Sequence, residues 1–300
     1  MDFCSSTLGT VGAELELQII DPLTLDLRDG IVPLLERVRE SPFVRPELMQ
    51  ACVEIGTRVC SSAEDIEGHL REVSTHLLRE IQELDMTLCG AGTHPFCRRL
   101  ATMTPRPRYR ELARRSGYLA HTQQVFATHI HVGVRSGQEA ITVMRDLRMY
   151  LPMLLAMSAN SPFWRGHETD CASYRHRILA ATRSYGIPPA FDSWEQFCEF
   201  LETTQRAGLF ASIKDIHWDI RPQPRFGTVE LRVMDAQSNL RHVAELAAFI
   251  RALVVHLSRK MQVPELPRPL PWWIEKENHY QASRMGLDAL YVQDAAGTVS

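Results

Sequence analysis

Short stretches in which apolar and polar residues alternate recur along the 300-residue chain, and this period of two predicts half-buried β-strands. In four of these stretches the polar positions are ionisable, so each strand would have an apolar back and an ionisable front. The four stretches are AELELQ with Glu14 and Glu16, ACVEIGT with Glu54, THIHVGV with His129 and His131, and GTVELRVMD with Glu230 and Arg232.

Apolar residues at three- and four-residue steps predict helices between these strands. The clearest helix begins at SSAEDIEG, where Ser61 and Glu64 have the spacing of a capping box. Further helices are predicted over 139–159, 192–204 and 241–260, with Pro152 bending the first of them or starting a new segment. Helices that cover only the apolar side of the strands would give an α+β fold, whose antiparallel sheet keeps its other face open to water or ligand.

Composition and charge narrow the possible partners. Hydrophobic residues make up 45% and charged residues 23%, as in ordinary soluble domains, and the formal net charge is -3. This balance argues against nucleic acid or an anionic membrane as the main partner. The basic stretch RPRYRELARR, from Arg106 to Arg115, is interpreted as a solvated loop leading into a helix rather than as an anion-binding site.

The start of the chain, MDFCSSTLGT, lacks the features of a secretory signal, and no apolar run approaches the length of a membrane span. The seven cysteines are scattered and include no C-x-x-C, which favours reduced thiols over disulfides or structural zinc. We therefore expect a cytoplasmic protein.

The ionisable front is the candidate functional surface. Two glutamates at i and i+2 lie roughly 6.6 Å apart and repel by about 0.6 kcal/mol in water or about 2.5 kcal/mol at a dielectric near 20, so Glu14 and Glu16 alone are compatible with an ordinary wet sheet face. The four strands together present glutamate, histidine and arginine without lysine. Carboxylates with imidazoles suit Mg²⁺ or Mn²⁺, and such a set can hold two ions about 3.5–4 Å apart. Arg232 would suit a phosphate whose charge grows during transfer.

Glycine-based nucleotide motifs are missing from the sequence. There is no G-x-x-x-x-G-K-[ST], CGAGTH lacks the dinucleotide-binding spacing, and no G-x-S-x-G is present. A nucleotide would therefore bind through metal ions and arginines.

Several long motifs resemble, in order, the carboxylate–amine ligases of the glutamate–cysteine ligase type 2 family. They are GAELELQIIDPLTLDL, ELMQACVEIGT, THIHVGV, ANSPFW, CASYR, GIPPAF and DIRPQPRFGTVELRVMD. The resemblance implies the curled antiparallel sheet of the glutamine synthetase superfamily with flanking helices. It also implies ATP- and Mg²⁺-dependent (or Mn²⁺-dependent) joining of a carboxylate to an amine, with glutamate and cysteine as substrates.

The resemblance also assigns roles by position. It implies metal ligands at Glu14, Glu16, Glu54, His129 and Glu230, a phosphate contact at His131, and a catalytic phosphate clamp at Arg232 beside Glu230. Weaker candidates are Arg175 for a substrate carboxylate and Glu47 as an additional ligand. The chain departs from the family pattern at Ala127 and at Asp170 and Cys171, the latter two near the expected substrate pocket.

Three hypotheses follow for residues 1–300, which we expect to form a single catalytic domain with a shorter C-terminal part than the family usually has. The leading one is a two-step ligase that forms an acyl phosphate from ATP and then an amide. The others are a metal-dependent hydrolase with the same ligands and a degenerate homologue that binds nucleotide without consuming it. Small molecules are the expected partners, and a homo-oligomer is left open.

Overall fold

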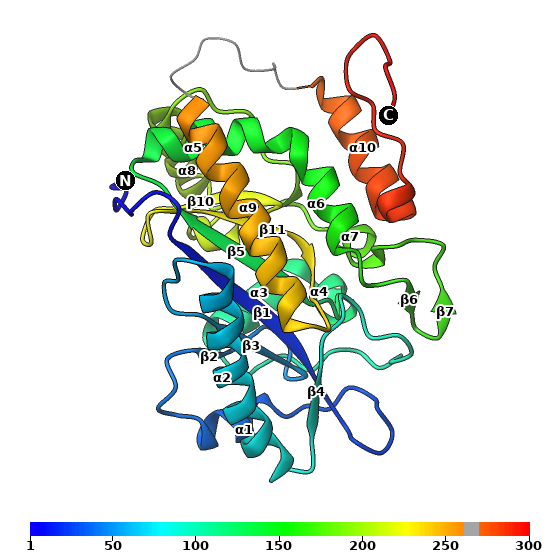
Figure 1. The fold of residues 1–300 in the computed structure, drawn as a ribbon. Coiled ribbons are helices and arrows are strands. Elements are labelled where there is room, and N and C mark those ends of the chain that lie inside the picture. Colours follow the sequence, from blue (N-terminus) through cyan, green and yellow to red (C-terminus); the bar gives the residue numbers. More distant parts are fainter. Residues whose placement is uncertain (261–269) are drawn as a thin grey trace.

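The computed structural model describes residues 1–260 and 270–300 and shows an α+β fold around one antiparallel sheet (Figure 1). The seven strands run in the order β10-β11-β5-β1-β3-β2, with β4 also paired to β1. Their bounds are β1 (Val11–Ile20), β2 (Val44–Pro46), β3 (Cys52–Gly56), β4 (Thr87–Cys89), β5 (Ala127–Gly133), β10 (Ile220–Gln223) and β11 (Thr228–Asp235). The central four, β11, β5, β1 and β3, are the strands that the alternating pattern predicted.

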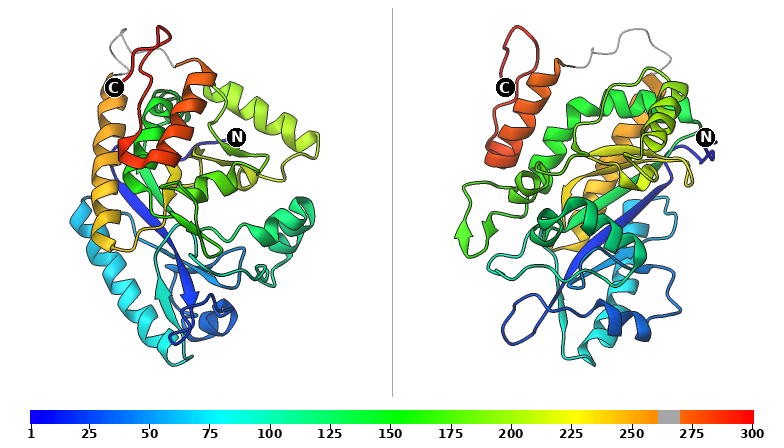
Figure 2. Two further views of the ribbon diagram at one scale, coloured as in Figure 1. Left: turned by 90° about the vertical axis from the view of Figure 1, so that its right-hand side faces the viewer. Right: turned by 180° about the vertical axis from the view of Figure 1, so that it is seen from behind.

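Four helices cover the apolar back of the sheet, as predicted. They are α2 (Ala63–Gln82), α5 (Gly137–Leu147), α6 (Leu151–Ser158) and α9 (Leu240–Lys260). Leu15, Ile130 and Leu231 point from neighbouring strands into this layer and are fully buried. The left view of Figure 2 shows α2 and α9 on one side of the sheet, with α3 (Pro107–Ser116) and α4 (Tyr118–Thr122) on the other.

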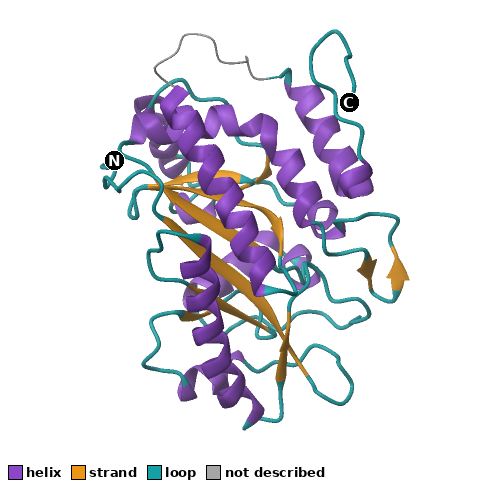
Figure 3. Ribbon diagram, in the orientation of Figure 1, coloured by secondary structure: helices purple, strands orange, loops and turns teal. Residues whose placement is uncertain are grey.

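The remaining elements surround this core, and Figure 3 shows how helices and loops enclose the strands. The helices are α1 (Ile31–Arg37), α7 (Tyr174–Leu179), α8 (Trp194–Arg206) and α10 (Trp272–Met285). Two small pairs are formed by β6 (Phe163–Trp164) with β7 (His167–Glu168) and by β8 (Tyr185–Gly186) with β9 (His217–Trp218).

A proline and a serine mark the beginnings of helices α6 and α2. Pro152 lies in the first turn of α6, directly after a 3₁₀ turn at Arg148–Tyr150, so it begins a new helix rather than bending one. The predicted capping box is wrong by one residue, because the Ser62 hydroxyl accepts the Asp65 N–H. Ser61 instead donates its hydroxyl and its backbone N–H to the Asp65 carboxylate.

A β-bulge interrupts β11. Leu231 pairs with Ile130, but the next aligned pair is Met234 with Thr128. Paired residues share a face of the sheet, so the extra residue turns Asp235 onto the ionisable front, opposite Ala127. The predicted alternation therefore holds up to Leu231 and changes phase after it.

The glycines of CGAGTH pack against the end of this strand. A Cβ on Gly90 would lie 2.2 Å from the Gln237 carbonyl oxygen, and one on Gly92 would lie 2.6 Å from the Asp235 carboxyl carbon. These glycines permit close packing against the end of β11 and the residues that follow it.

Candidate active site

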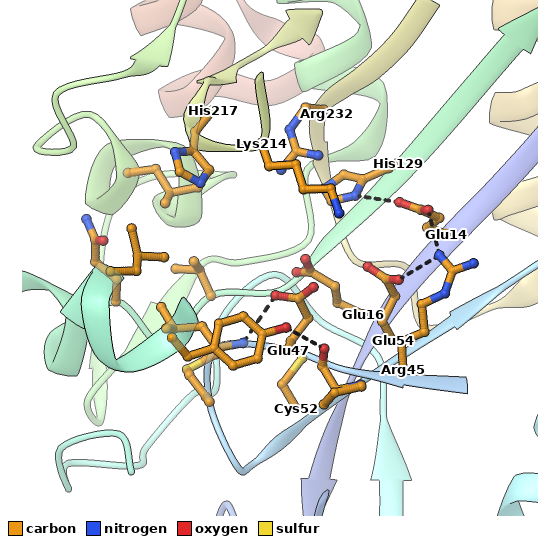
Figure 4. A pocket seen from close by; sticks show the side chains of 18 of the residues that line it. Glu14, Glu16, Arg45, Glu47, Cys52, Glu54, His129, Lys214, His217 and Arg232 are labelled. Carbon is orange, nitrogen blue, oxygen red and sulfur yellow. Dashed lines mark hydrogen bonds and ion pairs between the residues drawn. The ribbon is translucent and has the colours of Figure 1, made fainter. Parts of the chain in front are cut away.

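The ionisable front of the sheet forms the floor of a cavity of about 650 Å³ (Figure 4). Strand register brings its side chains together, because Glu16 pairs with Glu54, Glu14 with His129, and Glu230 with His131. All of the candidates from the sequence line this cavity, namely Glu14, Glu16, Glu47, Glu54, His129, His131, Arg175, Glu230 and Arg232. Their convergence is a finding of the structure, while their individual roles stay proposals.

Glu14 lies at the centre of a carboxylate–imidazole cluster. Its Oε2 is 3.5 Å from His129 Nδ1 and 3.6 Å from His131 Nε2. Burial opposes ionisation, but the two imidazoles hold the pKa of Glu14 well below its usual range. Burial and the nearby Arg232 lower the pKa of His129 to about 4, so this imidazole is neutral at pH 7 and can bind a cation through nitrogen.

Three further carboxylates crowd the floor beside this cluster. Burial and the neighbouring Glu47 raise the pKa of Glu16 to about 8. Burial also raises the pKa of Glu47 and, with Glu14 and the other two carboxylates, raises that of Glu54 well above its usual value. Raised pKa values of this kind mean that the carboxylates ionise more readily when a cation compensates their charge, which is the electrostatic property expected of a divalent-cation site.

Arg45 is a cation that sequence analysis missed. Its Nη1 lies 3.4 Å from Glu14 and 3.6 Å from Glu54. It comes from the three-residue strand β2, which pairs Arg45 with Glu54. The carboxylates of β1 and β3 therefore have an arginine partner that comes from a neighbouring strand.

Two guanidiniums enclose Glu230 at the other end of the floor. Arg221 Nε donates to Glu230 Oε2 at 2.7 Å, and Arg232 donates to Oε1. Burial alone would raise the pKa of Glu230, but Arg221 and Arg232 lower it below its usual range. Sequence analysis missed Arg221. Its position in IRPQ, shortly before the strand that carries Glu230, could have indicated that it lies on a neighbouring strand.

The residues present fit divalent metal ions. Ligand atoms of Glu14, His129 and Glu230 lie within 4.8 Å of one another, and so do those of Glu16, Glu54 and His129. His129 Nδ1 is buried and has no hydrogen-bond partner in residues 1–260 and 270–300. Oxygen-rich donors with a neutral imidazole are suited to Mg²⁺ or Mn²⁺.

Arg175 lines the cavity but is held by the protein. Its Nη1 and Nη2 donate to the carbonyls of Val233 and Arg232, and Nη1 lies 3.7 Å from the Asp235 carboxylate. Asp235, which sequence analysis missed, also accepts hydrogen bonds from Ser161 and Ser173. The bulge in β11 thus creates the anchor that fixes Arg175.

The cavity mouth is cationic. The exposed residues of its lining include Arg106, Arg108, Lys214 and Arg225. The stretch RPRYRELARR was predicted as a solvated loop leading into a helix, but all of it except Arg106 forms α3 itself; none of the α3 residues is buried. Within the described chain, the cavity lining includes Arg106 and Arg108 but neither Asp170 nor Cys171, which were expected near the pocket.

A helix-backed antiparallel sheet with an acidic, imidazole-bearing front is the catalytic fold of the glutamine synthetase-type ligases. A crystal structure of a glutamate–cysteine ligase from Francisella tularensis in complex with AMP is similar, with a TM-score of 0.67 and 12% identity over 100% of this chain and 76% of that one. A bifunctional glutathione synthetase from Pasteurella multocida has a TM-score of 0.68 and 14% identity over 92% of this chain and 42% of that one. These likenesses define the fold.

The chain belongs to glutamate–cysteine ligase family 2, whose model matches residues 10–299. It is 49% identical over 300 residues to a Trichormus variabilis protein named "Putative glutamate–cysteine ligase 2", covering 99% of this chain and 78% of the relative. It is 35% identical over 296 residues to a Mycolicibacterium smegmatis protein named "Putative glutamate–cysteine ligase 2-1", covering 98% of this chain and 79% of that one. Family and fold together support a carboxylate–amine ligase.

The described helices include none with the length and apolar character needed to cross a membrane.

Proposed function

We propose that this protein is an ATP- and Mg²⁺-dependent ligase that joins the carboxylate of glutamate to the amine of cysteine. The observation that carries the proposal is the convergence of carboxylates, imidazoles and guanidiniums from β1, β3, β5 and β11 on one cavity. Family membership supports the ligase chemistry, and the names of the curated relatives support this pair of amino acids.

Two groups of residues would hold the metal ions. The first is Glu14 with His129 and Glu230, and the second is Glu16 with Glu54, sharing His129. Bound Mg²⁺ would neutralise the charge of the ATP phosphates and draw them against the sheet. Glu47, whose pKa is raised by burial, lies beside the second group and is a further candidate ligand.

Arg232 and His131 would act on the transferring phosphoryl group. The side chain of Arg232 is only partly buried and lines the cavity (Figure 4). Burial opposes protonation of His131, but Glu230 and Glu14 raise its pKa, which favours donation to a phosphate oxygen. Preorganised donors of this kind stabilise the charge that builds up during transfer.

The proposed reaction has two steps. The glutamate carboxylate oxygen forms a bond to the γ-phosphorus as the bond to the β-phosphate oxygen breaks, giving an acyl phosphate and ADP. The amine then attacks the acyl carbon, loses a proton and displaces inorganic phosphate. The exposed cations at the mouth, such as Arg106 and Lys214, would attract the anionic substrates.

Incubating the purified protein with ATP, Mg²⁺, glutamate and cysteine tests the proposal. We expect phosphate release together with a dipeptide detected by mass spectrometry. Glu16→Gln should abolish both signals, whereas Glu72→Gln, at an exposed position on α2, should leave them unchanged.

Three results would contradict the proposal. Turnover without ATP would indicate a hydrolase. A nucleotide that raises the melting temperature but is not consumed with any amino acid would indicate a binding protein. Phosphate release that survives Glu16→Gln would remove Glu16 from the mechanism.

A further inference from the structure

A second cluster of buried polar side chains lies behind the cavity wall. It consists of His176 from α7, Asp219 from the junction of β9 and β10, and His279 from α10. Asp219 Oδ2 is 3.3 Å from His279 Nε2 and 3.8 Å from His176 Nε2. The exposed fractions are 5% for His176, 0% for Asp219 and 3% for His279. The two helices α7 and α10 contact each other, and Figure 1 shows α10 beside α6 at the edge of the molecule.

The hydrogen-bonding groups of this cluster are unsatisfied. Both carboxylate oxygens of Asp219, both ring nitrogens of His176 and Nε2 of His279 lack a hydrogen-bond partner anywhere in the described chain. Buried polar groups are rarely left unpaired, and a concentration of them at one point indicates a missing ligand. The hydroxyl of Tyr185, whose ring packs against His176 at a centroid distance of 5.4 Å, is likewise buried and unpaired among these residues.

The hydrogen bond of His279 determines which of its ring nitrogens carries the proton. Its Nδ1 lies 2.8 Å from the Glu275 carbonyl oxygen, which can only accept, so Nδ1 carries the proton. In a neutral ring Nε2 then presents a lone pair to Asp219 Oδ2, which is also an acceptor. Their separation of 3.3 Å exceeds an ordinary N–H···O distance of about 2.7–3.2 Å. A cation between the two atoms resolves this arrangement.

The charge of the Asp219 carboxylate also favours a bound cation. Within the described residues, the ion-pair partners of Asp219 are the two imidazoles, and no lysine or arginine contacts its carboxylate. A fully buried carboxylate without a lysine or arginine partner requires a compensating positive charge.

We propose that His176, Asp219 and His279 bind one Zn²⁺ ion. Tetrahedral zinc with bonds of about 2.0–2.2 Å to nitrogen and oxygen separates its ligand atoms by about 3.3–3.5 Å. The His279–Asp219 distance of 3.3 Å already fits, and the His176–Asp219 distance of 3.8 Å needs a movement of a few tenths of an ångström. Two imidazoles and one carboxylate favour zinc over Mg²⁺, which prefers oxygen. The Nδ1–H of His279, bonded to a backbone carbonyl, is the usual orienting contact of a zinc-bound histidine.

The ion would join three segments of the chain. It would tie α10 and α7 to the strand junction at Asp219, whose carbonyl accepts the Arg232 N–H at 2.7 Å and whose N–H donates to the Gly186 carbonyl at 2.8 Å. Because His176 follows Arg175, the same ion would also fix the start of the helix that carries Arg175. Zinc at this position would therefore link separate elements of the fold and is distinct from the ions proposed for the cavity.

Metal analysis of the intact protein tests this assignment. The protein is purified without a metal-affinity tag, gel-filtered in excess Mg²⁺ with a weak chelator, and its zinc measured by mass spectrometry. We expect about one zinc per chain. Asp219→Asn, His176→Asn and His279→Asn should each weaken zinc binding more than about 100-fold. Glu14→Gln in the cavity and His76→Asn on the exposed face of α2 should retain it.

Cobalt substitution and thermal melting give readouts that do not depend on the variants folding. Co²⁺ exchanged into the wild type should show the visible absorption of a tetrahedral site. Stripping zinc with a strong chelator should lower the melting temperature, and Zn²⁺ but not Mg²⁺ should restore it. Zinc that is absent and does not bind when added, or that is lost in Glu14→Gln but kept in Asp219→Asn, would overturn the proposal and leave a protonated His–Asp–His cluster.

Discussion

The acidic floor of the cavity makes stability depend on pH in an unusual direction. Burial and Glu47 raise the pKa of Glu16 from 4.5 to about 8, so the folded protein holds a proton that the unfolded chain releases. The stabilisation from this proton is complete below the unfolded pKa and is lost as pH rises through the folded pKa. Metal-free protein should therefore become less stable from mildly acidic to mildly alkaline pH.

The size of this loss of stability follows from the pKa shift of Glu16. At about 1.4 kcal/mol per pKa unit, moving one carboxyl from 4.5 to about 8 corresponds to at most about 5 kcal/mol. Glu16 keeps part of its surface accessible within the cavity, so water screens it and reduces this value. Between about pH 5.5 and about pH 8.5, we expect a loss of about 2–3 kcal/mol in the free energy of unfolding.

Urea denaturation in the presence of EDTA measures this loss directly. Glu16→Gln should have a shallower pH dependence than the wild type, and Glu47 and Glu54 should account for the slope that remains. Saturating Mg²⁺ should stabilise the wild type more at alkaline than at acidic pH, because cations bind the ionised carboxylates. Equal pH slopes for Glu16→Gln and wild type, or Mg²⁺ stabilisation that does not change with pH, would refute the reasoning. Glu72→Gln serves as the matched control at an exposed site.

Three other predictions concern the core and the cavity mouth. Gly90→Ala brings a methyl carbon to 2.2 Å from the Gln237 carbonyl oxygen and should cost about 1–3 kcal/mol, measured by urea denaturation; full stability would contradict the packing. Arg148→Met leaves the buried Glu275 carboxylate unpaired and should cost about 3–5 kcal/mol, whereas replacing both partners with apolar residues should cost less. Arg106→Ser combined with Arg108→Ser should raise the KM for anionic substrates several-fold at low salt, and initial rates at two ionic strengths should show the effect shrinking as salt increases.

The faces of the strands could be predicted from the sequence because they depend on local alternation. Glu14 and Glu16 must share a face whatever β1 pairs with, and the same holds for His129 and His131 on β5. The face that the helices cover could be predicted in the same way, because aliphatic residues occupy the alternate positions of these strands. The capping box was misplaced because Ser61–Glu64 and Ser62–Asp65 have the same spacing, and only the backbone conformation distinguishes them.

The site residues that sequence analysis missed are positioned by pairing between segments far apart in the chain. Arg45 reaches Glu54 through a three-residue strand too short to give a periodic signal. Asp235 shares a face of the sheet with the cavity residues because of a bulge that the residue pattern does not mark. Helix α10 was not predicted, because its buried positions include Glu275, Asn278 and His279 rather than an aliphatic stripe. Polar residues are buried there by partners that lie far away in the sequence.

The bulge in β11 sets the phase of the strand's last residues, and with it the link between sheet and helix α7. Glu230 and Asp235 are five positions apart, so a strand of regular alternation would turn their side chains to opposite faces. The extra residue lets the carboxylate that pairs with Arg232 and the carboxylate that pairs with Arg175 share one face of the sheet. Straightening this strand without shortening it would turn the Asp235 carboxylate toward the aliphatic layer and leave Arg175 without that ion pair, even when every side chain that faces the cavity is preserved.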